Sequence, residues 1–177
     1  MIYVLMGDSE FAEGQIYEAL QLASHYKLNN LIGILDINRL GQRGETMIGW
    51  DIETYKKRVE SFGWNTIVIE HGNDMDEVQE ALAQIHNSKF INHKSKPLMI
   101  IAKTKKGAGI TSVEDKDGWH GKPLTKEMLV EAIQEIGEFD TSMTGDVETP
   151  EKIDIPLNNY QLQATSYKLP TTQTATR

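Results

Sequence analysis

Four short apolar runs alternate with amphipathic segments over the first 137 residues of the chain. The runs show no apolar and polar alternation and are too short for helices, which predicts strands that are buried on both faces of a sheet. The amphipathic segments repeat their apolar side chains at helical spacing. The predicted strands cover residues 2–6, 31–37, 66–70 and 98–103, and the predicted helices cover residues 13–26, 51–62, a segment that starts near 74, and 125–136.

Strands that alternate with helices predict an α/β fold with a mostly parallel sheet, because parallel strands need crossover helices and these cover both faces of the sheet. The first predicted strand starts almost at residue 1. It is therefore expected at a sheet edge or in a sheet that is incomplete on its N-terminal side. Asp74, followed three residues later by Glu77, is typical of a capping box at the start of a helix. Residues 38–50 and 105–120 are predicted to be loops.

The pattern changes after residue 137. Residues 138–177 are rich in Thr, Pro and Gln and show no sustained period, which is typical of a linker. We therefore predict one domain over residues 1–137 and an extended tail over residues 138–177.

Composition narrows the class of protein. A chain of 177 residues can bury one substantial core, and a net charge of −8 with interspersed signs argues against a general nucleic-acid binder. The absence of Cys excludes disulfides and thiolate metal sites. No apolar run approaches the length of a membrane-spanning helix, and the first run is too short for a signal peptide, so we expect a cytoplasmic protein.

Polar residues follow the first two predicted strands at the point where each strand ends. Gly7-Asp8-Ser9 follows the first strand, and Asn38 follows the second. The carboxyl ends of neighbouring parallel strands meet at one edge of the sheet, where ligands bind in open α/β folds. A carboxylate, an amide oxygen and free backbone groups beside a helix start suit a magnesium ion that carries a diphosphate. Taken singly, Asp8 and Asn38 would also fit as turn residues.

This pattern resembles the diphosphate-binding domain of the transketolase family, which uses thiamine diphosphate and shows Gly-Asp-Gly followed by Asn at the spacing seen here. The resemblance covers roughly residues 1–137, and the tail is similar to the family's connection to its next domain. The other matching blocks, in order, are Glu13-Gly14, Tyr17-Glu18-Ala19, Lys27-Leu28-Asn29-Asn30-Leu31, Asp36 to Gln42, Phe62-Gly63-Trp64, Ile100 to Gly107, Glu114-Asp115-Lys116 and Trp119 to Leu124.

The resemblance implies a thiamine diphosphate-binding fold and transfer of a two-carbon ketol unit from a ketose phosphate to an aldose phosphate, a transferase reaction of the pentose phosphate pathway. The implied cofactors are thiamine diphosphate and Mg²⁺, with Ca²⁺ or Mn²⁺ as substitutes. The side chains of Asp8 and Asn38 and the backbone carbonyl of Leu40 would bind the metal. Diphosphate oxygens and a water would complete the octahedral shell that Mg²⁺ prefers.

The resemblance also assigns roles to residues whose chemistry alone is less specific. His120 would be the catalytic residue, touching cofactor and substrate, since an imidazole can transfer protons near neutral pH. Lys122 would bind substrate, and Lys106 would bind the cofactor in the same cavity. By composition alone these would be a structural histidine and surface lysines. The remaining cofactor-binding positions that the resemblance implies are Gly7, Asp8, Ser9, Glu13, Asn38 and Gln42.

Two of these positions need comment. Glu13 matches a Glu at the family's dimer interface, although a Glu in the first turn of a helix is favourable without any function. Ser9 stands where the family has Gly. Because Gly allows a close backbone approach to the diphosphate, Ser9 is expected to restrict the backbone, and a strained site could cost about 1–3 kcal/mol.

The family's cofactor lies between a diphosphate domain and the pyrimidine-binding domain of a partner subunit. We therefore predict that the chain acts in a dimeric assembly with chains that supply the missing N-terminal strands and the pyrimidine-binding domain. The isolated chain is expected to be inactive.

Two alternatives stay open. The chain could be a non-catalytic remnant of the family or a binding module. It could also be a GDSL-type esterase, with Ser9 as nucleophile and Asp117 and His120 at the Asp-x-x-His spacing of that class. The esterase's oxyanion block would be Gly72-Asn73-Asp74, where His71 occupies the position that needs Gly.

Overall fold

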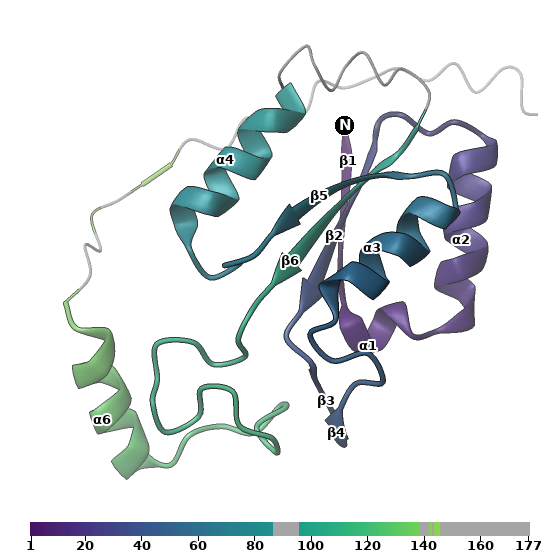
Figure 1. Ribbon diagram of the computed structural model, residues 1–177. Coiled ribbons are helices and arrows are strands. Elements are labelled where there is room, and N and C mark those ends of the chain that lie inside the picture. Colours follow the sequence, from purple (N-terminus) through teal and green to yellow (C-terminus); the bar gives the residue numbers. More distant parts are fainter. Residues whose placement is uncertain (87–95, 139–141, 143, 146–177) are drawn as a thin grey trace, which may run out of the picture. The chain divides into compact units, whose positions relative to one another are not determined.

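The computed structural model describes residues 1–86, 96–138, 142, 144 and 145 (Figure 1). Met1–Phe139 forms one compact unit. The predicted tail over residues 138–177 lies almost entirely outside the described residues, so the predicted boundary at 137 stays a prediction. Within the described part of the chain, no helix is long and apolar enough to cross a membrane.

A four-stranded parallel sheet forms the centre of the unit. Its strands lie in the order β1-β2-β6-β5, and every neighbouring pair is parallel. The register places Gly7 beside Asp36 and Asp36 beside Ala102, so the polar residues that follow β1 and β2 emerge at the same edge of the sheet. The strands are β1 (Ile2–Gly7), β2 (Leu31–Ile37), β5 (Asn65–Ile69) and β6 (Leu98–Lys103).

Helices cover both faces of this sheet, as predicted for the α/β class. One apolar cluster joins Phe11, Leu20 and Tyr55 to the strand residues Leu35 and Ile101. A second cluster joins α4 to the opposite face, and Figure 1 shows α4 across the sheet from α3. The helices are α1 (Asp8–Phe11), α2 (Gly14–His25), α3 (Ile52–Ser61), α4 (Met75–His86) and α6 (Lys126–Ile136).

Most elements lie where the sequence predicted them, and two were missed. Helix α1 follows β1 without a loop, and a small antiparallel hairpin, β3 (Leu40–Gly41) with β4 (Gly44–Glu45), lies inside the predicted loop 38–50. The prediction that the first strand is buried was wrong. Strand β1 is an edge strand, and its Ile2 and Leu5 are 55% and 72% exposed.

The predicted capping box at the start of α4 formed only in part. The carboxylate of Asp74 accepts hydrogen bonds from the N–H groups of Asp76 (2.8 Å) and Glu77 (3.3 Å), as expected of an N-cap. The carboxylate of Glu77 accepts instead from the N–H of His71 (3.0 Å) and contacts the His71 ring nitrogen Nδ1 at 2.6 Å. The preceding turn brings His71 closer than the Asp74 backbone, so the reciprocal bond is replaced.

Candidate functional site

Asp8 is the first residue of α1 and is buried, with 3% of its surface exposed. Its Oδ2 accepts hydrogen bonds from the backbone N–H of Arg39 (2.7 Å) and the hydroxyl of Thr46 (3.2 Å). Burial raises the pKa of Asp8 above its usual value. The hydrogen bonds from Arg39, Thr46 and Ser9 oppose the increase, and the nearby charge of Asp36 adds to it. A buried carboxylate with this balance favours a bound cation.

The turn after β2 faces Asp8 and carries the second predicted ligand. Asn38 is buried, and its Oδ1 accepts from the N–H of Leu40 (3.1 Å) while its Nδ2 donates to Asp36 (2.8 Å). Arg39 has a left-handed backbone, with φ of 61°. This conformation is uncommon for a residue other than Gly, and it accompanies the contact between the Arg39 N–H and Asp8.

The guanidinium of Arg39 is held by side chains of the chain itself. It pairs with Asp115 at 2.8 Å and with Glu45 at 3.5 Å, and it stacks on the Trp50 ring at 4.7 Å. Planar guanidinium groups suit such paired and stacked contacts. The ion pair with Asp115 ties the turn to the loop over residues 105–120, and the structure gives Arg39 an architectural role at the site.

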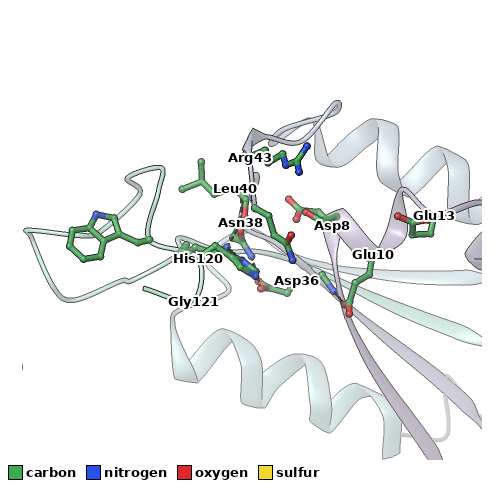
Figure 2. Close-up of a pocket in the computed structure, with 14 residues that line it drawn as sticks. Asp8, Glu10, Glu13, Asp36, Asn38, Leu40, Arg43, His120 and Gly121 are labelled. Atoms are coloured by element: carbon green, nitrogen blue, oxygen red, sulfur yellow. Dashed lines mark hydrogen bonds between the residues drawn. The ribbon is translucent and has the colours of Figure 1, made fainter. Parts of the chain in front are cut away.

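An open cavity of about 890 Å³ lies at this edge of the sheet (Figure 2). The lining residues are Gly7, Asp8, Ser9, Glu10, Glu13, Asp36, Asn38, Leu40, Gln42, Arg43, Lys106, Trp119, His120 and Gly121. Figure 2 shows Asn38 and Leu40 between Asp8 and His120. The cavity therefore brings together residues from β1, α1, the turn after β2 and the loop over residues 105–120.

Lys106 and His120 meet at the cavity wall. The Nζ of Lys106 donates to the carbonyl oxygen of Leu40 (2.7 Å) and lies 3.3 Å from Nδ1 of His120. If Lys106 donates to that nitrogen, the imidazole proton is on Nε2. This tautomer would leave an N–H on His120 available for a ligand.

All but one of the predicted site residues line the cavity. The exception is Lys122, whose Nζ lies 4.5 Å from the centre of the Trp119 ring and whose side chain is exposed. Glu13 lies at the N-cap of α2 and not in its first turn, and it makes no capping hydrogen bond through its side chain. The lining residues that were not among the predicted site residues are Glu10, Asp36, Arg43, Trp119 and Gly121. Thr46, which is not in the lining, was also not predicted, and it donates to Asp8.

The backbone at Ser9 is not left-handed, so strain of that kind is absent, and the effect of the Ser9 side chain on an approaching diphosphate stays a prediction. Ser9 lies inside α1, and its φ is not among the positive values of the described residues. Its hydroxyl rests against Gly41, where a Cβ would stand only 2.9 Å from the Ser9 Oγ. The absence of a side chain at position 41 therefore makes room for Ser9, and a right-handed helical backbone accepts Ser without the expected cost.

The geometry does not assemble an esterase. A nucleophilic serine needs a base within hydrogen-bond reach. In the described residues, no hydrogen bond joins Ser9 to His120 or Asp117 to His120; Nδ1 of His120 faces Lys106, and Asp117 Oδ1 accepts from the N–H of Gly118 at 2.7 Å. The side-chain oxygen of Asn73 accepts from the N–H of Lys105 at 2.7 Å. Asn73 lines a different cavity from Ser9 and His120, so its NH₂ group is not placed to donate to an oxyanion formed at Ser9.

The donors at this edge fit a hard divalent cation. The candidate ligands, Asp8, Asn38 and the Leu40 carbonyl, all offer oxygen, which Mg²⁺ requires. Among the described residues no Lys or Arg side chain forms an ion pair with Asp8. The carbonyl of Leu40 already holds one positive group, the ammonium of Lys106. The site therefore combines the buried carboxylate of Asp8 with the Leu40 carbonyl, which already accepts from a positively charged group, the Lys106 ammonium.

The family model described as "Transketolase, thiamine diphosphate binding domain" matches residues 1–155 of this chain. The chain belongs to the transketolase family. It is 45% identical to the transketolase of Homo sapiens over 155 residues, which is 88% of this chain and 23% of that protein. It is 40% identical to the transketolase-like protein 1 of Bos taurus over 166 residues, which is 93% of this chain and 27% of that protein.

Solved structures of transketolases share the fold of this family member. The transketolase of Campylobacter jejuni superposes with a TM-score of 0.61 at 35% identity, over 74% of this chain and 20% of that one. A transketolase mutant from Pichia stipitis superposes with a TM-score of 0.63 at 27% identity, over 76% of this chain and 19% of that one. The chain thus spans about a quarter of the length of the relatives that it matches.

Proposed function

We propose that this chain binds Mg²⁺ and the diphosphate of thiamine diphosphate as one part of a transketolase. The observation that carries the proposal is the group of buried oxygens that line the cavity at the carboxyl ends of β1 and β2, in a chain of this family. Asp8, Asn38 and the Leu40 carbonyl would hold the metal. The assembled enzyme would transfer a two-carbon ketol unit from a ketose phosphate to an aldose phosphate.

Thiamine diphosphate, when bound, supplies the carbanion chemistry, and the protein supplies binding, orientation and electrostatics. Lys106 would neutralise phosphate charge from the cavity wall, and Gly7, Ser9 and Gln42 would line the cofactor. His120 would hold or transfer a proton near the substrate. Lys122 would reach the substrate only by leaving the Trp119 ring, since it lies outside the cavity lining.

We further propose that activity needs additional polypeptide, including a pyrimidine-binding domain, in a dimeric assembly to which Glu13 contributes. This proposal is supported by the short span of the chain relative to its relatives and by the open form of the cavity. A cytoplasmic location remains a prediction.

The pure 177-residue chain should show negligible ketol transfer, because it lacks most of the relatives' length. Isolation from native cells under gentle conditions, with mass spectrometry of bound proteins, would identify a chain that carries a pyrimidine-binding domain. The recombined chains should transfer ketol units with Mg²⁺ and thiamine diphosphate, and the donor to test is xylulose 5-phosphate, which is named in a solved transketolase complex. Robust transfer by the pure chain would contradict the need for partners, and recovery of the chain alone, without cofactor binding, would favour a non-catalytic remnant.

A Ser9→Gly variant tests the finding that Ser9 is unstrained. We expect its affinity for Mg²⁺ and thiamine diphosphate to stay within about threefold of the natural chain in the assembled complex, because Ser9 has a helical backbone that does not require Gly. Isothermal titration calorimetry measures this affinity. A gain of tenfold or more in the Gly variant would show that the serine side chain obstructs the diphosphate.

A further inference from the structure

Asp36 is the last polar residue of β2 before the turn that carries Asn38, and its two carboxylate oxygens have different partners. One oxygen, Oδ1, accepts a hydrogen bond from the hydroxyl of Thr104, which follows β6. The other, Oδ2, accepts from the Nδ2 of Asn38 at 2.8 Å. Asp36 also lines the cavity. The carboxylate therefore joins the ends of two neighbouring strands and contacts a candidate metal ligand.

Thr104 is itself fixed in place by its backbone. Its N–H donates to the carbonyl of Ile37 at 3.0 Å, and its carbonyl accepts from the indole Nε1 of Trp50 at 3.1 Å. The hydroxyl that holds Asp36 is thus mounted on a rigid segment. A carboxylate held in this way can impose an orientation on the amide that it contacts.

The amide of Asn38 has one orientation that satisfies both of its neighbours. Its Nδ2 donates to the Asp36 carboxylate, and its Oδ1 accepts from the N–H of Leu40 at 3.1 Å. A flipped amide would place its oxygen against the carboxylate and its NH₂ against the Leu40 N–H, and both contacts would be repulsive. The Oδ1 retains a second lone pair, because an amide oxygen can accept twice.

We propose that Asp36 is a positioning residue for the cation site, which fixes the Asn38 amide so that its oxygen, and not its nitrogen, is presented to Mg²⁺. This inference rests on the proposed function. Asp36 acts through Asn38 and is not itself a metal ligand. Outer partners that orient a ligand typically change metal affinity by about 10- to 100-fold when they are removed.

The experiment uses the full chain and four variants. Asp36→Ala removes the acceptor, Thr104→Val releases the carboxylate, and the double variant Asp36→Asn with Asn38→Asp reverses the pair while keeping its charge. In the double variant, an amide at position 36 would donate to a carboxylate at 38, whose other oxygen stays available. Asp76→Asn, which removes an exposed carboxylate in the first turn of α4, is the matched control for loss of one negative charge.

Two readouts separate this inference from the proposed function. In ¹⁵N NMR spectra, the side-chain NH₂ signals of Asn38 and the hydrogen exchange of the Leu40 amide report the amide orientation without any ligand. In calorimetry, Mg²⁺ is titrated in the presence of inorganic pyrophosphate. Asp36→Ala should shift the Asn38 signals, speed Leu40 exchange and weaken Mg²⁺ binding about 10- to 100-fold. Thr104→Val should change the Asn38 signals, the Leu40 exchange rate and the Mg²⁺ affinity in the same direction but by a smaller amount.

The double variant should recover Mg²⁺ affinity to within about threefold, and the control should match the natural chain. Unchanged Asn38 signals and Leu40 exchange in both Asp36→Ala and Thr104→Val would overturn the inference, whether or not Mg²⁺ binds. Altered NMR signals with unchanged Mg²⁺ affinity would also overturn it. If the natural chain shows the oriented amide but binds no Mg²⁺, then the proposed function fails and the contact of Asp36 with Asn38 stands as a structural one.

Discussion

Asp8→Asn should weaken Mg²⁺-dependent binding of thiamine diphosphate by about 100-fold or more. Loss of an outer partner of a metal ligand typically costs about 10- to 100-fold, so loss of the charged ligand itself should cost at least as much. Asn has nearly the same shape as Asp and can still accept from the Arg39 N–H and the Thr46 hydroxyl. The variant therefore removes the charge and leaves the surrounding turn in place. Calorimetry on the assembled complex measures the loss.

The same variant should have a higher Tm than the natural chain in metal-free buffer, because it removes the buried negative charge. At neutral pH the folded state carries the cost of a buried carboxylate near Asp36, which raises the pKa of Asp8. Folding raises the pKa of this acidic group, so its charged form lowers the free energy of unfolding at pH values above that pKa. Because protonation of Asp8 relieves this cost, the gap in Tm should be largest near pH 7 and should close as the pH falls through the raised pKa.

Two outcomes would contradict this reading of Asp8. Cofactor affinity unchanged in Asp8→Asn would remove Asp8 from the metal site. A lower Tm for Asp8→Asn in metal-free buffer would show that the Asp8 charge stabilises the fold. It would mean that the hydrogen bonds to Asp8 outweigh the cost of its burial. Asp76→Asn, at an exposed position, is the control for both measurements.

Phe11→Ala should destabilise the chain by about 3–5 kcal/mol, the usual cost of removing a buried aromatic ring. Phe11 is fully buried and packs edge-on against Tyr17 at 5.4 Å and Tyr55 at 5.7 Å between ring centres. Such a loss is a large part of the stability of an ordinary domain. Urea unfolding followed by circular dichroism would measure it.

The consequence of Phe11→Ala for the site is as important as its consequence for the fold. Phe11 and Asp8 are the two buried residues of the four-residue helix α1. Because Phe11 anchors this helix to α2 and α3, the variant should also weaken Mg²⁺ binding. Leu22→Ala, at a position in α2 that is 54% exposed, should change stability by less than about 0.5 kcal/mol. Equal losses of stability and of Mg²⁺ affinity in Phe11→Ala and Leu22→Ala would show that the Phe11 contacts do not anchor α1.

The longer strands and helices were predicted correctly because their apolar runs and helical repeats extend over enough residues to be recognised in the sequence. Strands β2 and β6 have the bounds that the sequence predicted, since a buried parallel strand is a continuous apolar run. The hairpin β3–β4 and helix α1 were missed because two-residue strands and a four-residue helix show no period. The edge position of β1 was one of the two placements expected for it, but the exposure of its side chains was missed, since an apolar run gives the same pattern whether or not a neighbour covers it.

The sequence by itself determined the fold class and the candidate oxygens of the proposed metal site, Asp8 and Asn38, because strand ends and local composition are encoded in consecutive residues. Only the tertiary structure decided which groups control those oxygens. The contact of Thr46 with Asp8 spans 38 residues, and the contact of Thr104 with Asp36 spans 68. Such partners are set by the alignment of neighbouring strands and by packing of the turns, and neither leaves a periodic signal along the chain.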